Sequence, residues 1–210
     1  MGGVQIDRID RAQQLAEGAT QLAGVDGTQA SSLSAALPQL MAQVDQGLAF
    51  LRRRVPGFEH AVLAAVAPKI GVRETRRVIG DLVLGEEDIM RGRKRADGIA
   101  KGGHELDILA VDGHRHETIA EGGSYDIPLD CLIPAGQRGL LMAGRCVSST
   151  REAQSSLRVM GTCMAMGQAA GTAAALCARD AGWGGDVREV DRARLRARLI
   201  DDGAVLEGVL

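Results

Sequence analysis

The segment from Leu140 to Leu176 contains the residue types best suited to holding a small ligand. An apolar run of strand length, LLMAGR, passes through Gly144, and a helix of small residues is predicted over residues 159–178. Ligands of open α/β sheets bind beyond the carboxyl ends of such strands. The start of a helix offers N–H groups without intrahelical acceptors and the positive end of the helix dipole. Gly161 and Thr162 leave these N–H groups uncovered, so the segment favours an anionic or electron-rich ligand there.

Close packing is a second explanation for the same helix. Its small residues would allow a neighbouring element to approach its backbone, and small-residue helices have this role more often than a binding role. The residues that form the stripe are Gly167, Ala170, Gly171 and Ala174.

The dinucleotide fingerprint G-x-G-x-x-G, which would follow a strand and open a helix, is absent from the sequence. The stretch GWGGDV follows a helix and lacks the third glycine. By itself, the chain is therefore not expected to hold a dinucleotide pyrophosphate in that manner.

Composition limits the classes of function. The chain has 210 residues, 45% of them hydrophobic and 25% charged, which suits one or two globular domains. Aromatic residues make up only 2%, which argues against stacking platforms for single-stranded nucleic acid. The net charge of −2 predicts no general attraction to a polyanion, and the short basic clusters at 52–54 and 91–95 are expected to be solvated.

The sequence contains no apolar run of membrane-spanning length and no readable signal peptide, so we expect a cytoplasmic protein. Its four cysteines form no CxxC pair and are expected to be buried free thiols, Cys146 included, although a redox thiol is the alternative at that position. His114 and His116 fit a solvated hairpin, and no metal site is expected. The cysteines are Cys131, Cys146, Cys163 and Cys177.

Periodicity and breakers predict the order of elements. A short helix is expected near residues 12–22, and a longer one over 31–54 that starts either at Ser31 or at Pro38. Extended runs follow at 61–72 and 78–84, a hairpin region at 101–121, the strand that ends at Gly144, and a polar loop before the small-residue helix. An amphipathic helix within 186–210 has Val190, Leu195, Leu199 and Ile200 on its apolar side.

Two long blocks of this sequence resemble the C-terminal half of FAD-dependent oxidoreductases, two-domain flavoproteins with a nucleotide fold of the glutathione-reductase type. The blocks are PKIGVRETRRVIGDLVLGEEDI and YDIPLDCLIPAGQRGLLMAGRCVSSTREAQSSLRVMGTCMAMGQAAGTAAAL, and the resemblance runs from about Gly24 to the C-terminus. It implies a mixed α/β chain: a partial nucleotide-binding fold that lacks its N-terminal glycine-fingerprint half, plus part of a substrate domain. The expected divisions are 1–124 (substrate or cap domain), 125–185 (closing segment of the FAD domain) and 186–210 (C-terminal helix).

The resemblance also implies site residues. Two residues match the family's positions near the ribityl and phosphate groups of FAD: Gly144 and Arg145. Four more match the positions that face the pyrimidine edge of the flavin: Val159, Met160, Gly161 and Thr162. Those expected to act on substrate are Arg73, Arg76 and Arg158.

Two of these assignments have alternatives. The segment RETRR is a candidate clamp for a substrate carboxylate or hydroxyl, but an Arg–Glu salt-bridge network through Glu74 explains it equally well. Arg158 contacts either substrate or the loop of Glu152 and Ser155. Tyr125, the only tyrosine, either donates a proton or caps a hairpin.

The function expected from the resemblance is hydride transfer between a small polar substrate and N5 of FAD. The alternative is a non-catalytic, truncated remnant that acts as a binding or oligomerisation module. The expected partners are a small-molecule substrate and either a chain that supplies the N-terminal half or further copies of this chain, with no nucleic acid and no membrane.

Overall fold

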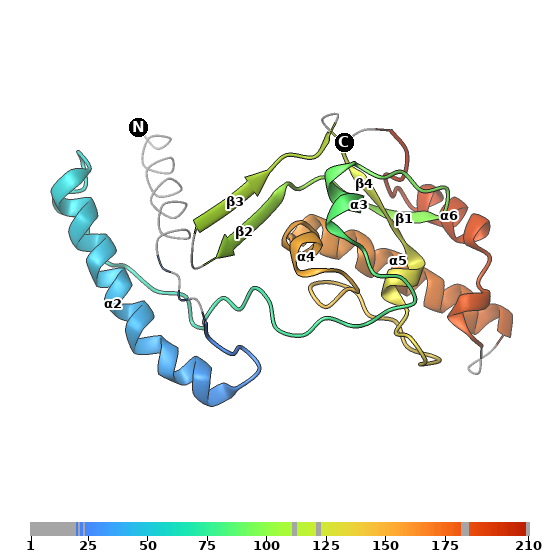
Figure 1. The fold of residues 1–210 in the computed structure, drawn as a ribbon, viewed down its shortest axis with the longest axis horizontal. Helices are drawn as coiled ribbons and strands as arrows, with labels where there is room; N and C mark the ends of the chain where they lie inside the picture. Colours follow the sequence, from blue (N-terminus) through green and yellow to red (C-terminus); the bar gives the residue numbers. More distant parts are fainter. Residues whose placement is uncertain are drawn as a thin grey trace. The chain divides into compact units, whose positions relative to one another are not determined.

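The structure is a computed structural model that describes residues 20, 22, 24–110, 113–120, 123–181 and 185–208 (Figure 1). The chain divides into two compact units, Met1–Thr75 and Arg76–Leu210, which are described separately below. The short helix expected near residues 12–22 falls almost entirely outside the described residues, as does Trp183.

In the described part of the first unit, the long helix α2 spans Ala30–Arg54, so the start expected near Ser31 is confirmed and the alternative start at Pro38 is wrong. Pro38 lies inside the helix. Three arginines in the last turn face the negative end of the helix dipole, which stabilises the helix terminus. Residues 61–74 carry no helix or strand assignment, so the extended run expected at 61–72 is not a strand. A Cβ at Gly27 would lie 3.0 Å from side-chain carbons of Val72 and Thr75.

The second unit has its core between two short strands and two helices. Strand β1 (Gly98–Gly102) pairs antiparallel with β4 (Tyr125–Pro128), and both strands are buried along their whole length. Helix α5 (Met160–Ala181) packs against β1, and α6 (Arg192–Asp201) contacts both (Figure 1). Side chains of these elements fill the core, among them Ile99, Ile127, Met166, Ala169, Ala173, Leu195 and Leu199.

The expected hairpin is present as β2 (Leu106–Ala110) paired antiparallel with β3 (Gly113–Glu117). Helix α4 (Arg151–Leu157) packs against β2 and also contacts α3 (Glu86–Met90). The polar loop expected before the small-residue helix is thus largely helical, with all residues from Ala153 to Leu157 buried. The one-turn segments η2 (Leu129–Leu132) and η4 (Val187–Glu189) complete the described elements.

The apolar run LLMAGR is not a strand of a ladder, contrary to expectation. Residues 140–143 carry no helix or strand assignment, and the amide of Met142 donates to the carbonyl of Leu132 at 2.8 Å. Gly139 and Gly144 have φ values of +66° and +96°, so the backbone turns at both ends of the run and leaves only four residues between. The run at 78–84 likewise forms only isolated bridges, at Gly80 and Leu84.

In fold class, the described residues combine helices with small antiparallel sheets, which is consistent with a mixed α/β chain. Helix α6 confirms the expected C-terminal helix, with Leu195 and Leu199 in the core, but Ile200 is exposed rather than on the buried face. Among the residues described, no helix is both long and apolar enough to cross a membrane.

Candidate functional site

A tight turn at Gly144 opens the candidate site. Gly144 has φ +96°, a conformation that favours glycine, and the amide of Val147 donates to its carbonyl at 3.1 Å. An added Cβ at Gly144 would meet no atom within 4 Å, so the backbone borders open space. The carbonyl of Arg145, the next residue, accepts a hydrogen bond of 3.3 Å from Nε2 of Gln154 on α4.

The segment before α3 holds the rest of this loop in place. The amide of Val78 donates to the carbonyl of Cys146 at 2.8 Å, and the amide of Leu84 donates to the carbonyl of Ser148 at 3.1 Å. Between them, the amide of Gly80 donates to the buried hydroxyl of Ser148 at 2.9 Å. A Cβ at Gly80 would lie 2.9 Å from the Cβ of Ser148, so this close approach requires glycine.

The RETRR segment reaches the same loop through Arg77, which was not among the expected site residues. Its Nε donates to the carbonyl of Ser149 at 3.1 Å. Arg76 precedes it in the same unit with an exposed side chain. Arg73 is also exposed but belongs to the first unit, Met1–Thr75. The structure therefore brings Arg77 to the Gly144 loop, and Arg76 lies directly beside it in the chain.

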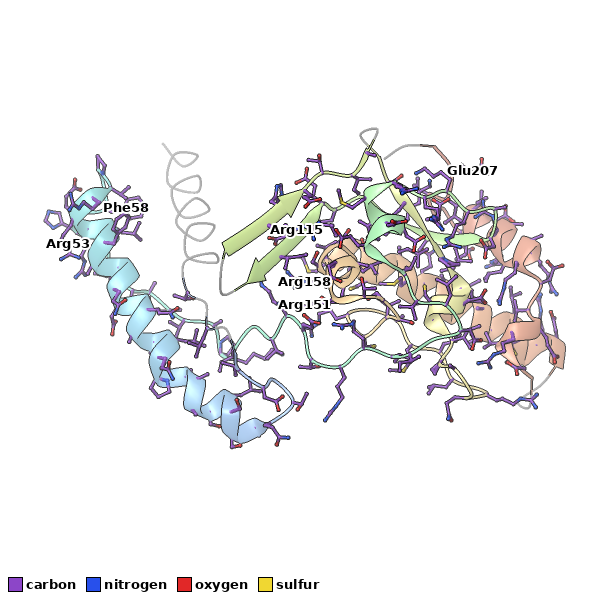
Figure 2. The ribbon with its side chains drawn as sticks, in the orientation of Figure 1. Arg53, Phe58, Arg115, Arg151, Arg158 and Glu207 are labelled. Atoms are coloured by element: carbon purple, nitrogen blue, oxygen red, sulfur yellow. The ribbon has the colours of Figure 1, made fainter. Side chains whose placement is uncertain are left out.

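Arg158 ends α4 and fastens that helix to the hairpin. Its guanidinium donates to the carbonyl of Asp107 at 3.0 Å, and the amide of Asp107 donates to Oγ of Ser155 at 3.2 Å. Figure 2 labels Arg151 and Arg158 on this helix. Arg158 therefore contacts Asp107 of β2. The hydroxyl of Ser155 also donates to the carbonyl of Glu152 at 2.7 Å, within α4.

Helix α4 has a capping signal in the sequence. Thr150 precedes it in an extended conformation, and its side-chain oxygen accepts from the amide of Ala153 at 3.3 Å. Glu152 adds a negative charge to the first turn. A threonine followed by an acidic first turn is a recognised helix start, so this element was within reach of sequence reasoning.

The start of α5 is open to solvent on one side. The amide of Cys163 donates to the carbonyl of Val159 at 3.0 Å, which fixes the first intrahelical bond. Met160 is 81% exposed, Gly161 is exposed, and a Cβ at Gly161 would meet no atom within 4 Å. The side chain of Thr162 turns inward and is buried. The backbone of Met160 and Gly161 is therefore what this helix start offers to a ligand.

The turn and the helix start lie next to each other. Burial raises the pKa of the Cys163 thiol, the positive charge of Arg145 opposes this shift, and Cys146 adds to it. Charge effects of this kind act over short distances, so Arg145 and Cys146 of the loop lie close to the first turn of α5. The structure thus brings Arg145 and Cys146 close to Cys163 in the first turn of α5, and a cofactor-binding role for Gly144, Arg145 and residues 159–162 stays a prediction.

The other chemical candidates have structural positions. Tyr125 is fully buried on β4, where its hydroxyl lies 2.8 Å from Oγ of Ser156, and burial raises its pKa well above its ordinary value. This position suits neither a proton donor to substrate nor a hairpin cap. Cys131 and Cys177 are buried as expected, whereas Cys146 and Cys163 are only partly buried.

No cluster of metal-binding side chains was found among the residues that the structure describes. Nε2 of His116, on β3, lies 2.5 Å from the carboxylate of Glu105 just before β2, with both side chains substantially exposed. This agrees with the solvated hairpin expected from the sequence, although its acidic partner was not foreseen.

Comparison with known proteins identifies the family. The family model described as FAD dependent oxidoreductase matches residues 5–199, nearly the whole chain. Neither the curated proteins nor the solved structures gave a significant match. The family implies FAD as the cofactor. The chain therefore belongs to the FAD-dependent oxidoreductase family.

Proposed function

We propose that the chain supplies the C-terminal part of a flavoprotein that transfers a hydride between a small polar substrate and N5 of FAD. The family supports an oxidoreductase in general terms. The finer proposal rests on the open space at Gly144 and Gly161 and on the effect of Arg145 on Cys163 in the first turn of α5.

The residues present fit a flavin at this place. The backbones at Gly144 and Gly161 both border open space, so a flat ring can approach them without meeting a side chain. Gly161 lies in the first turn of a 22-residue helix, where N–H groups lack intrahelical acceptors. FAD supplies the hydride-accepting ring when bound, and negative charge then develops on its pyrimidine edge. N–H donors at Met160 and Gly161 would stabilise that charge, since they are oriented before the reaction.

Two arginines of the second unit, Arg76 and Arg158, suit a polar or anionic substrate. Arg76 is exposed next to Arg77, which is held to the loop by Ser149. Arg158 comes directly before the helix start, and its contact with Asp107 fixes the direction of its guanidinium. We assign Arg76 and Arg158 to substrate binding, and a substrate role for Arg73 of the first unit stays a prediction from the resemblance. A planar guanidinium pairs with carboxylate or hydroxyl oxygens in defined geometry.

The proposal includes a partner for the nucleotide end of FAD. The sequence lacks the glycine fingerprint that cradles the pyrophosphate. We propose that a chain with the N-terminal half of the fold, or a second copy of this chain, completes the site. The divisions 1–124, 125–185 and 186–210 remain the proposed domain plan.

A second candidate function is an assembly module without catalysis. Large apolar side chains are exposed in both units, including Phe50, Val62, Ile79, Met160 and Met164, each at least half exposed. Such side chains favour association when they form a contiguous surface. This candidate predicts oligomers that hold no flavin.

A visible absorption spectrum separates the two candidates. The purified 210-residue chain is incubated with FAD, passed through gel filtration, and examined for the flavin bands. Flavin that elutes with the protein, and is bleached under anaerobic conditions by a small polar alcohol or acid, supports the oxidoreductase. A colourless oligomer supports the assembly module.

A further inference from the structure

Helix α5 carries a regularly spaced row of exposed apolar residues along its length. The steps between its members are 4, 3, 4, 3 and 4 residues, which is the heptad period of a seam along which two helices pack. Two large side chains in it, Met160 and Met164, are 81% and 74% exposed. We call this row the α5 seam; its members, all exposed, are Met160, Met164, Gly167, Gly171, Ala174 and Ala178.

The α5 seam is free of charge over about five turns. The sequence from Met160 to Ala178 contains no Asp, Glu, Lys or Arg. The other described helices of at least ten residues, α2 and α6, carry charged residues on their exposed faces, such as Asp45 and Arg194. A continuous apolar face of this kind favours a helix that has the same spacing, and α5 of a second copy has it by necessity.

The spacing of the α5 seam is the same when read in either direction. Two copies of α5 that run antiparallel therefore place every member opposite a member. Each methionine then faces an alanine, and glycine faces glycine at the centre, so that large and small residues alternate across the contact as in a packed core. Parallel copies would instead place methionine against methionine at one end and leave the glycines apart. The antiparallel pairs are Met160 with Ala178, Met164 with Ala174, and Gly167 with Gly171.

An open groove beside the C-terminal part of the seam fits the same arrangement. It has a volume of about 580 Å³, lies between α5 and α6, and is lined by the small residues Gly171, Ala175 and Ala197. In the antiparallel pair, Met164 of the second copy lies at the level of Ala174, so its long side chain can extend into this groove. The methionines and the groove occupy opposite ends of one helix, which is what a two-fold axis requires of a surface that binds itself.

Electrostatics also favour the antiparallel pair. The positive start of each helix dipole lies beside the negative end of the other. The chain has a net charge of only −2, so two copies repel each other weakly.

We propose that two copies of this chain form an antiparallel, two-fold symmetric dimer through the α5 seam. The contact is a single helix pair about 27 Å long, which is less than a standard interface, so its dissociation constant lies in the micromolar range. The proposal does not rest on flavin binding, and Gly161 is not a member of the seam. It is tested without FAD, so its failure would leave the flavin site standing.

Sedimentation velocity of the full chain at about 1–300 µM tests the dimer. We expect a monomer–dimer equilibrium for wild type. Gly171→Glu should raise the dissociation constant by about tenfold or more because it buries a carboxylate in the seam, and an added Cβ there meets no atom within 4 Å of its own chain. Ala193→Glu, an exposed change on α6, is the control and should leave the dissociation constant unchanged. Circular dichroism confirms that both variants keep their helices.

Disulfide trapping tests the direction of the helices. Met164→Cys and Ala174→Cys chains are mixed and oxidised with copper phenanthroline, and peptide mass spectrometry assigns the linked positions. We expect a link between positions 164 and 174 of different chains. Neither variant should link to itself, since like positions lie about 15 Å apart along the pair. Wild type, oxidised in parallel, accounts for the four native thiols.

Three results would overturn the proposal. The first is a wild-type chain that stays monomeric up to the highest concentration. The second is a Gly171→Glu chain that dimerises as wild type does, since the contact would then lie elsewhere. The third is a link from position 164 to position 164, which would mean parallel helices.

Discussion

Arg77 donates a hydrogen bond of 3.1 Å from Nε to the carbonyl of Ser149, across 72 positions of sequence. This contact joins the RETRR segment to the loop that runs from the Gly144 turn to α4. The neighbouring residue, Arg76, is exposed. Two adjacent arginines of one motif therefore have different environments, and we assign them different roles: Arg77 positions the loop, and Arg76 is proposed to meet substrate.

Replacing Arg77 with methionine tests the positioning role. Loss of a partly buried, charge-assisted hydrogen bond is expected to lower the free energy of unfolding by about 1.5–3 kcal/mol. Urea unfolding followed by circular dichroism measures this change. Arg76→Met is the matched control, and it should stay within about 0.5 kcal/mol of wild type because its side chain is exposed. Equal stability of the two variants would contradict the distinction.

Gly102 is predicted to tolerate no side chain. It pairs with Tyr125, and a Cβ there would lie 2.2 Å from Cζ of the buried ring and 2.3 Å from its hydroxyl oxygen. Gly102→Ala should therefore destabilise the chain by about 1–3 kcal/mol or more through overpacking. Gly161→Ala, where space is open, should be neutral or stabilise by up to about 1 kcal/mol because alanine favours helix. Thermal unfolding of both variants gives the comparison, and an unchanged Gly102→Ala protein would refute the packing described for Tyr125.

Asp191 is predicted to stabilise α6 as its N-cap. Its carboxylate accepts from the amides of Ala193 and Arg194 at 2.9 and 3.2 Å. Asp191→Ala should cost about 1 kcal/mol of unfolding free energy. Glu189→Ala, an exposed change two residues earlier, serves as the control in the same urea experiment. A loss as large for Glu189→Ala would show that the cap is not the cause.

Asp186 is predicted to contribute to stability at neutral pH but not in acid. The amide of Arg188 lowers the pKa of its carboxyl, burial partly opposes this, and the guanidinium groups of Arg188 and Arg138 add to the lowering. Because the pKa of Asp186 is lower in the folded state than the ordinary value of 3.8, its ionised carboxylate stabilises the fold when the pH is above 3.8. This stabilisation is lost as the pH falls through the pKa of the folded state. Asp186→Asn should therefore lose less stability than wild type between about pH 7 and pH 3. Equal losses in urea titrations at the two pH values would contradict the shift.

Local signals in the sequence predicted the long elements well. Helices α2 and α6 follow from apolar spacing, and α5 follows from its run of small residues with Arg179 near its end; these signals depend on nearby residues only. The same holds for the β2–β3 hairpin. Helix α4 was missed because its serines suggested a loop, although Thr150 and Glu152 mark a helix start; those serines are buried against β2 and His104.

Long-range contacts account for what the sequence could not predict. The run LLMAGR has strand composition, but strand pairing depends on neighbouring segments, and Gly139 and Gly144 with positive φ leave only four residues between two turns. Nothing local to RETRR shows that Arg77, rather than Arg73, reaches Ser149. At the candidate site, the resemblance to a family predicts Gly144 and Gly161, while the residues that hold the loop, Ser148 and Gln154, became visible only in the fold.

The most direct test of the flavin site compares two glycines of α5. Gly161 lies in the first turn of the helix and Gly167 lies farther along it; both are exposed, and a Cβ at either would meet no atom within 4 Å. Leucine at either position should therefore leave the fold intact. Quenching of FAD fluorescence measures the affinity of wild type, Gly161→Leu and Gly167→Leu. We predict saturable binding by wild type and Gly167→Leu and a loss of about tenfold or more for Gly161→Leu, since the side chain would occupy the space in front of the helix start. Equal affinities for the two variants would contradict the placement of FAD at this helix.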